Sequence, residues 1–171
     1  KRDRTIVLLA MEKGGYFLTF ADETMRADRE VALAAVRSHG PAMKWVSETF
    51  RNDRDFVLAA VERNDWALKW APETLKNDRD VVLAAVTQNG EALEWASAEL
   101  KNDRDVVLVA VTQNGRALEW ASAELKNDRD IVLVAVRQAG FGAYQHASEE
   151  LKRDPEIERV ERAARRLGIL A

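Results

Sequence analysis

The chain has 171 residues, 47% apolar and 32% charged, a composition typical of a folded globular protein rather than of a disordered one. Its 26 lysines and arginines nearly balance 29 aspartates and glutamates, so the formal net charge is -3 and the basic excess of a nucleic-acid-binding protein is missing. The absence of cysteine excludes a disulfide scaffold, thiol catalysis and a thiolate metal site.

A repeat of 25 residues organises the chain. Residues 78–102 and 103–127 differ only at Ala84/Val109 and Glu91/Arg116. The same register predicts one array of six repeats, at 3–27, 28–52, 53–77, 78–102, 103–127 and 128–153, the last with one extra residue, followed by a helix over 154–171. Self-similarity at a fixed short period is the signature of a stacked repeat fold.

The first element of each repeat is an apolar run, typified by residues 79–89. Asp78 or the residue before it can cap a helix there, and Asp80 places negative charge in the first turn. Gly90 is expected to end the helix in a left-handed conformation, and Asp65, at the same position of the third repeat, tolerates that conformation better than most residues. The pattern predicts about three turns of helix, buried between neighbours.

A second, shorter helix is expected directly after the glycine, because one apolar face at helical spacing is made by Ala92, Leu93, Trp95 and Ala96. A serine then caps a last short turn ending at Leu100 and its equivalents; the serines are Ser47, Ser97, Ser122 and Ser148. Such a unit is too small to bury a core alone, so stacking must stabilise it.

The C-terminal segment 154–171 is predicted as an amphipathic capping helix. Pro155 suits a first helical position, and one apolar stripe follows, made by Ile157, Val160, Ala164 and Leu167. The chain starts at Lys1 rather than at methionine, and no polar element precedes the first helix, so we expect a trimmed piece or a first repeat that caps itself.

These elements predict an all-α solenoid of six helical repeats of about 25 residues with a C-terminal capping helix. The alternative is a leucine-rich repeat, a horseshoe lined by strands, whose period includes 25 residues. That pattern fits Val81, Val86 and Asn89 but fails where alanine takes a leucine position and where Gly14 and Ala139 replace the asparagine.

The repeat unit resembles a known family. The N-D-R-D-V-V-L start, the N-G turn and the A-L-x-W-A-S segment recur together, and they resemble the tandem short helical repeats catalogued as domain of unknown function 4116. The family tends to carry tyrosine where Trp70, Trp95 and Trp120 stand here. The resemblance covers nearly the whole chain except the terminal helix, implies a helical repeat fold, and supplies no catalytic residue.

An aromatic residue recurs near the end of the second helix. The aromatic ladder consists of Phe20, Trp45, Trp70, Trp95 and Trp120, with His146 at the same place in the last repeat. Half-exposed indoles in a row can grip a peptide or a base. Packing between repeats explains their recurrence equally well, and we favour packing.

Other polar patterns have plain structural explanations. The Asp-Arg pair that opens each repeat suits helix capping and links between neighbouring repeats. Asp78 and Asp80 lack the further ligands of a calcium loop, and His39 and His146 occupy different repeat positions. We therefore expect no catalytic residue, no metal site and no cofactor.

Residues that change between otherwise similar repeats are candidates for specificity. The position after the glycine carries Tyr16, Pro41, Trp66, Glu91, Arg116 and Phe141, and the same edge carries Lys13, Ser38, Arg63, Gln88, Gln113 and Gln138. Exposed large side chains are typical anchors of interfaces. We predict partner contacts at Tyr16, Trp66, Arg116 and Phe141.

The sequence thus favours a non-enzymatic scaffold that binds a protein or peptide through an extended surface. A structural spacer in a larger assembly is the alternative, and an enzyme is the third class. No nucleic acid is expected as a partner, and no apolar run reaches the roughly 18 residues of a membrane span. A soluble protein, compatible with a reducing intracellular compartment, is expected.

Overall fold

The computed structural model describes residues 4–166, which form helices and turns without a strand among them. The predicted all-α repeat fold is confirmed, and the leucine-rich alternative is wrong because it needs a strand in every repeat. The apolar stripe position Leu167 lies outside the described residues.

The chain divides into two compact units, Lys1–Ala85 (unit 1) and Val86–Ala171 (unit 2). Unit 1 holds the long helices α1 (Arg4–Lys13), α3 (Arg29–Ser38) and α5 (Arg54–Val61), with the short helices η1 (Gly15–Phe20), α2 (Glu23–Arg26), η2 (Gly40–Trp45), α4 (Glu48–Arg51), η3 (Asp65–Trp70) and α6 (Glu73–Lys76). Helix α7 (Arg79–Gln88) contains the boundary, since Ala85 ends unit 1 and Val86 begins unit 2.

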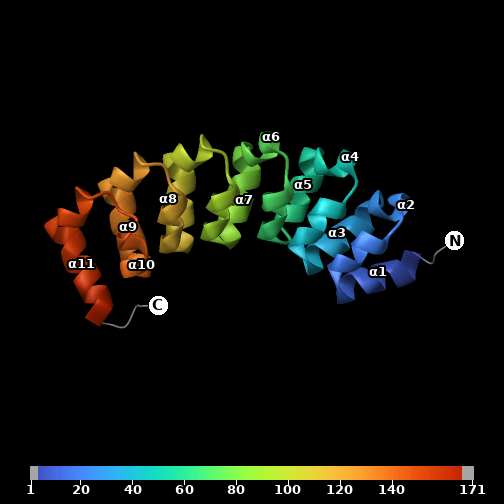
Figure 1. Cartoon of the computed structure of the whole chain (residues 1–171), viewed down its shortest axis with the longest axis horizontal. Coiled ribbons are helices and arrows are strands. Elements are labelled where there is room, and N and C mark those ends of the chain that lie inside the picture. Colours follow the sequence, from blue (N-terminus) through green and yellow to red (C-terminus); the bar gives the residue numbers. More distant parts are fainter. Residues whose placement is uncertain (1–3, 167–171) are drawn as a thin grey trace. The chain divides into compact units, whose positions relative to one another are not determined.

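Unit 2 continues with η4 (Gly90–Trp95), η5 (Leu100–Asn102), α8 (Arg104–Gln113), η6 (Gly115–Trp120), η7 (Leu125–Asn127), α9 (Arg129–Ala139), α10 (Phe141–Tyr144), η8 (Leu151–Arg153) and α11 (Pro155–Arg166). Within each unit the long helices of successive repeats lie side by side: α1, α3 and α5 in unit 1, and α8, α9 and α11 in unit 2 (Figure 1). The short helices also contact their counterparts, as η2 does η3 and η4 does η6. Within each unit, successive repeats therefore bury apolar residues against one another.

From α3 onward the long helices begin at an aspartate, as predicted. Asp28 accepts hydrogen bonds from the backbone N–H groups of Glu30 and Val31 at 3.0 and 3.1 Å, and Asp103 accepts the corresponding two bonds, both at 3.0 Å. Such a cap contributes about 0.5–2 kcal/mol to helix stability. Asp53, Asp78, Asp128 and Asp154 accept backbone hydrogen bonds in the same way, so capping recurs with the repeat.

The glycine after the long helix has a different role from the predicted one. Among the described residues only Gly140 has a positive φ, of 54°, so the left-handed end expected at Gly90 and Asp65 is wrong. The chain instead turns into extended backbone at the asparagine before the glycine. A Cβ on Gly115 would lie 2.2 Å from the carbonyl oxygen of Ala135, so glycine is needed for the close approach of the next repeat.

The second helix is a 3-10 helix in five repeats and an α-helix in the sixth. η1, η2, η3, η4 and η6 each have six residues, whereas α10 covers Phe141–Tyr144. An α-helix holds more residues per turn than a 3-10 helix, so this change accommodates the extra residue of the sixth repeat. The Tyr144 hydroxyl donates to the carbonyl of Lys152 at 2.8 Å and anchors the altered segment.

The predicted serine cap is present in three repeats. The Oγ atoms of Ser97, Ser122 and Ser148 accept from the backbone N–H three residues later, at 3.1–3.2 Å. At Ser47 the prediction is wrong: its buried Oγ makes no hydrogen bond with any described residue. The turn that follows is the α-helical α4 there, whereas the other three serines precede a 3-10 turn.

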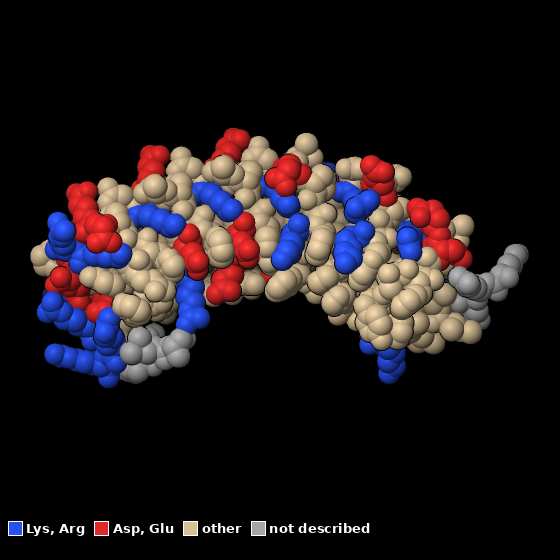
Figure 2. Space-filling view, viewed as in Figure 1, with Lys and Arg blue, Asp and Glu red and all other residues tan. Residues whose placement is uncertain are grey.

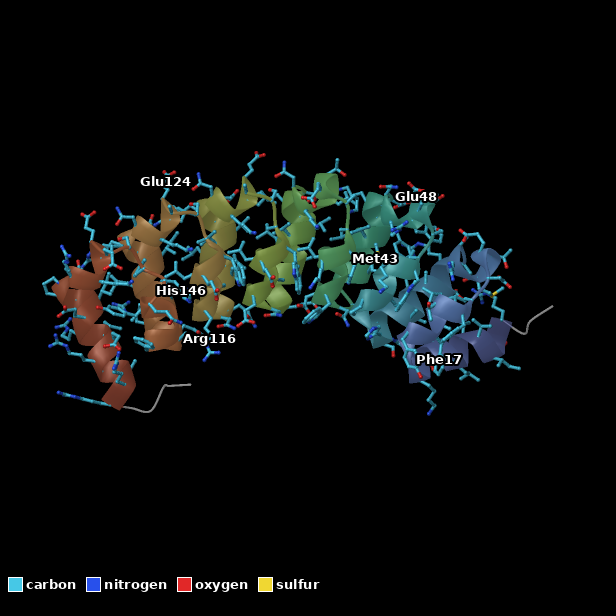
Figure 3. The ribbon with its side chains drawn as sticks, in the orientation of Figure 1. Phe17, Met43, Glu48, Arg116, Glu124 and His146 are labelled. Carbon is cyan, nitrogen blue, oxygen red and sulfur yellow. The ribbon has the colours of Figure 1, made fainter. Side chains whose placement is uncertain are left out.

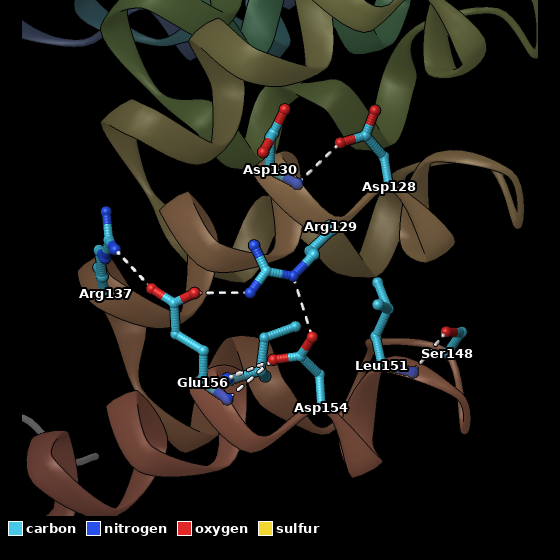
Figure 4. A network of polar contacts seen from close by, with 9 residues as sticks. Asp128, Arg129, Asp130, Arg137, Ser148, Leu151, Asp154 and Glu156 are labelled. Carbon is cyan, nitrogen blue, oxygen red and sulfur yellow. Dashed lines mark hydrogen bonds and ion pairs between the residues drawn. The ribbon is translucent and has the colours of Figure 1, made fainter.

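Arginine side chains link successive repeats. Each donates to the capping aspartate and to a second carboxylate of the next repeat, pairing Arg4 with Asp28 and Glu30, Arg54 with Asp78 and Asp80, Arg104 with Asp128 and Asp130, and Arg129 with Asp154 and Glu156 (Figure 4). These pairs help intersperse acidic and basic side chains over the surface (Figure 2).

The same arginines change the acidity of the caps. The hydrogen bond from Arg4 holds the pKa of Asp28 below its usual range, and Arg54 does the same for Asp78. Because the arginines are exposed to solvent, each pair stabilises the stack only weakly. In each of these pairs, one aspartate carboxylate therefore both caps its own helix and links two successive repeats.

Two glutamines of the predicted variable edge also serve stacking. Gln113 Oε1 accepts from the backbone N–H of Gly90 at 2.6 Å, and its Nε2 donates to the carbonyl of Gln88 at 3.0 Å. Gln138 makes the same two bonds to Gly115 and Gln113, at 2.6 and 3.3 Å. These side chains satisfy backbone groups where the previous long helix ends, so they are not free specificity positions.

Helix α11 closes the array of unit 2 with one apolar face. Ile157 and Ala164 are buried, and Val160 is partly buried. Glu161, also buried, pairs with Arg165 one turn later. The predicted amphipathic helix is therefore present over Pro155–Arg166.

Candidate functional site

Two of the four predicted contact residues come together in unit 2. Arg116 and Phe141 line one surface cavity of about 400 Å³, which we call the edge pocket. The residues that define it are Glu91, Glu94, Arg116, Glu119, Trp120 and Phe141, with His146 beside them. Figure 3 labels Arg116 on η6 and His146 just after α10.

The pocket is built on short helices whose starts are fixed by asparagine. Asn89 Oδ1 accepts from the backbone N–H of Glu91 at 3.1 Å, and Asn114 Oδ1 accepts from that of Arg116 at 3.0 Å. Asn114 Nδ2 also donates to the Glu91 carboxylate at 3.0 Å. Variable side chains are thus presented by a scaffold that is the same in both repeats.

Negative charge predominates in the edge pocket. Three carboxylates, of Glu91, Glu94 and Glu119, face a single guanidinium. His146 lies with its Nε2 3.7 Å from Glu119 Oε2, but burial lowers the pKa of the imidazole and outweighs the attraction of that carboxylate. The lowered pKa favours the neutral imidazole, so the formal charge of the lining comes from the three carboxylates and the guanidinium of Arg116.

The aromatic ladder is partly exposed. Phe20 is 76% and Trp70 36% exposed, while Trp45, Trp95 and Trp120 are half-buried. In unit 1 the Lys44 ammonium lies 4.5 Å from the ring centre of Trp45 and 5.5 Å from that of Trp70. Ring faces of the ladder are therefore accessible to a cation.

The other two predicted contact residues lie in unit 1. Tyr16 is 49% exposed and packs on Phe17 with ring centres 4.2 Å apart. Trp66 is 46% exposed, and the Lys69 ammonium lies 5.6 Å from its ring centre. Neither belongs to the edge pocket.

Sequence reasoning missed the carboxylates of the pocket. The position before the ladder ring carries Lys44 and Lys69 in unit 1 but Glu94 and Glu119 in unit 2. That reversal of charge was visible in the repeat alignment and is the signal that could have identified the site. Its meaning depends on the cavity, which the sequence does not show.

A second hollow lies on the first repeat. It has a volume of about 260 Å³ and is lined by apolar side chains, including Ile6, Met11, Phe17 and Phe20. Ile6 is 65% exposed, whereas Ile131 at the same repeat position is fully buried. The position is buried where a preceding repeat covers it, so this face has the character of an inter-repeat surface.

Two further observations concern residues 4–166. No three histidine, aspartate or glutamate side chains there are grouped so that they could hold a metal ion. Nor does that part of the chain contain a helix long and apolar enough to cross a membrane.

Comparison with known proteins identifies the repeats. No curated protein and no solved structure shows significant similarity to the chain. The profile described as domain of unknown function 4116 matches residues 3–51, 28–76, 53–101, 78–126 and 103–152. Each match spans two successive repeats, and consecutive matches overlap by one repeat. The chain therefore belongs to the tandem helical-repeat family named domain of unknown function 4116.

Proposed function

We propose that this chain is a non-enzymatic interaction module that binds a protein or peptide partner through the edge pocket. The carrying observation is that the residues that vary between near-identical repeats meet in one cavity. Residues 78–102 and 103–127 differ at only two positions, and one of them holds Glu91 in the first repeat and Arg116 in the second. Both of these residues line the cavity.

The surroundings of these residues support binding. Phe141 is 41% exposed, and Arg165 covers one face of its ring at 4.7 Å from the centre. Aromatic and arginine side chains at a concave site are the groups that contribute most at protein interfaces. The stacked helices beneath are held by buried apolar contacts, so the pocket is preformed and little ordering opposes binding.

Affinity capture from native cells tests this proposal. The bait is the chain carrying Arg116→Ser and Phe141→Ser, compared with wild type and with Glu124→Ser. Glu124 is exposed and lies away from the pocket, near the turn η7 (Figure 3). Partners retained by wild type and by Glu124→Ser should be lost with the double variant, while the circular dichroism of all three stays the same.

An unchanged set of partners with the double variant would overturn the proposal. The pair Tyr16→Ser and Trp66→Ser serves as a second comparison, because these exposed residues lie in unit 1 outside the pocket. Their replacement should weaken capture less than replacement of Arg116 and Phe141 does.

A structural spacer is the second candidate, and the apolar face of the first repeat favours it. Ile6 and Phe20 are exposed there, and Ile131, at the position of Ile6 in the sixth repeat, is fully buried. A spacer would stack on a further helical repeat through this face. Sedimentation should then show concentration-dependent association that Phe20→Glu abolishes, whereas a chain that stays monomeric at all concentrations contradicts a stacking role.

A further inference from the structure

We infer that the edge pocket receives a lysine or arginine side chain of the partner; this inference rests on the proposed function. The repeat itself provides the template, because unit 1 shows how such a cation sits on the ladder. Lys44 directly precedes its ladder ring, and its ammonium lies near the faces of both Trp45 and Trp70. A cation within about 6 Å of an aromatic ring centre is attracted by the negative face of the ring.

Unit 2 keeps the ring and reverses the charge beside it. The position of Lys44 is occupied by Glu94 and Glu119, and Trp120 forms a wall of the cavity. A ring face that holds an internal ammonium in unit 1 is thus lined with carboxylates in unit 2. A cation of the binding partner would take the place next to the ring that the Lys44 ammonium takes in unit 1.

The lining carries three carboxylates and one guanidinium, so its formal charge is negative, while the ammonium groups of Lys126 and Lys152 lie outside the lining but near enough to act on His146. Arg116 lies against the backbone of α10, since a Cβ on Gly142 would meet its Nε at 3.1 Å. The Glu91 carboxylate is held by Asn114, a neutral amide, which leaves its charge uncompensated by that contact. Opposite charges a few ångström apart attract strongly where water is partly excluded, and an acidic partner would be repelled.

The cavity is large enough to admit one long side chain. Its volume of about 400 Å³ lies at the lower end of the range for small-molecule pockets, which is roughly 300–1,000 Å³. An exposed rim next to a preformed cavity suits an extended segment that inserts one long side chain. Lysine and arginine both have a flexible stem and a terminal cation that can reach ring and carboxylates together.

Selection from a random peptide display library tests the inference on the full chain. Peptides bound by the wild type should be enriched in lysine or arginine over the unselected library. The best peptide is then resynthesised with each cation replaced in turn by norleucine, which keeps the stem and removes the charge, and by the other basic residue. Affinity should fall about tenfold or more when one particular cation is lost, the loss of about 1.4 kcal/mol. Unchanged affinity after exchange of lysine for arginine, or the reverse, shows that the pocket recognises the positive charge that the two side chains share.

Two protein variants with the same change in net charge separate the pocket from the general surface. Glu119→Lys places a lysine before Trp120, as Lys44 stands before Trp45, so an internal cation should occupy the site and weaken binding about tenfold or more. Glu124→Lys, at an exposed residue outside the pocket, should change affinity by less than about twofold, because distant surface charges are screened by salt.

The outcomes distinguish the inference from the proposed function. Enrichment of basic residues together with the loss in Glu119→Lys supports both. A second outcome is that the selected peptides lack enrichment in basic residues and still fail to bind the variant with Arg116→Ser and Phe141→Ser. That result overturns the cation inference and leaves the proposed binding module in place. If Glu119→Lys and Glu124→Lys weaken peptide affinity equally, the edge pocket is not where the cation binds, and the inference is overturned. No peptide enriched above a carrier without protein overturns both.

Discussion

Replacement of Gly115 by alanine probes the contact between successive repeats. The added Cβ would lie 2.2 Å from the Ala135 carbonyl oxygen and 2.9 Å from the Ala139 Cβ. Ordinary nonbonded contacts lie near 3.5 Å, so the overlap with the carbonyl exceeds about 1 Å. A backbone carbonyl inside a long helix cannot rotate away, and α9 must therefore move from η6.

The free energy of unfolding should fall by about 2–3 kcal/mol, since overpacking of a well-packed interface costs about 1–3 kcal/mol and here backbone must yield. With a urea dependence of about 2 kcal/mol per molar, the midpoint drops by roughly 1 M. Urea unfolding followed by circular dichroism measures this directly. A midpoint for Gly115→Ala equal to that of the wild type would refute the close-approach explanation of the glycine.

Gly142→Ala is the matched control. The nearest neighbour of its added Cβ is the Arg116 side chain, at 3.1 Å from Nε, and a flexible side chain can shift at little cost. Gly142 also lies within α10, where alanine is favoured over glycine by up to about 1 kcal/mol. Its midpoint should stay constant or rise.

Three further outcomes follow from the caps and the core. Asp28→Ala should lower the free energy of unfolding by about 1–2 kcal/mol. Asp28→Asn keeps the cap and loses only the exposed ion pair with Arg4, so it should cost clearly less, and urea titration distinguishes the two variants. The pKa of Asp28 and of Asp154 is lowered in the folded state, so their contribution to stability is complete above the ordinary value of 3.8 and is lost as the pH falls below it. Acid titration should therefore show the free energy of unfolding dropping in that range. A flat profile would count against a stabilising role of the arginine–aspartate pairs. Ile131→Ala should cost about 2–5 kcal/mol by calorimetry because the side chain is fully buried, and Ile6→Ala, 65% exposed at the equivalent position, far less; equal costs would contradict the assigned burial.

The repeat register, the helices and their aspartate caps could be predicted from the sequence because they follow from local rules. Asp103 caps a helix by bonding to the backbone two and three residues on, and that bond needs no distant partner. The apolar run after it fits a strand as well as a buried helix, and only its flanks, a capping residue before it and a glycine after it, favour the helix. Identical local signals in six repeats made the architecture clear.

Features that depend on the neighbouring repeat could not be predicted in this way. Gly90 has the sequence context of a helix end, yet its small size serves the approach of Ala110, whose carbonyl oxygen a Cβ would meet at 2.2 Å. Gln113 has the variability of a surface position but bonds to backbone of the preceding repeat. Stacking distance, not the repeat's own residues, decides both roles.

The candidate site was half predicted for the same reason. Variation between repeats identified Arg116 and Phe141 but also Tyr16 and Trp66, since variability marks exposure and not convergence. Glu94 and Glu119 were visible as a change of charge from Lys44. Their function depends on a cavity formed by side chains of three successive repeats of unit 2.

The most direct test of cation recognition compares equivalent rings in one spectrum. The chain has five tryptophans, each with one indole N–H resonance, which single Trp→Phe variants assign. On titration with a short oligolysine peptide, the Trp120 indole resonance should shift saturably, while that of Trp45, whose ring already has Lys44 over it at 4.5 Å, should stay in place. Equal shifts of the two resonances, or no saturable shift at Trp120, would contradict recognition of a cation by the edge pocket.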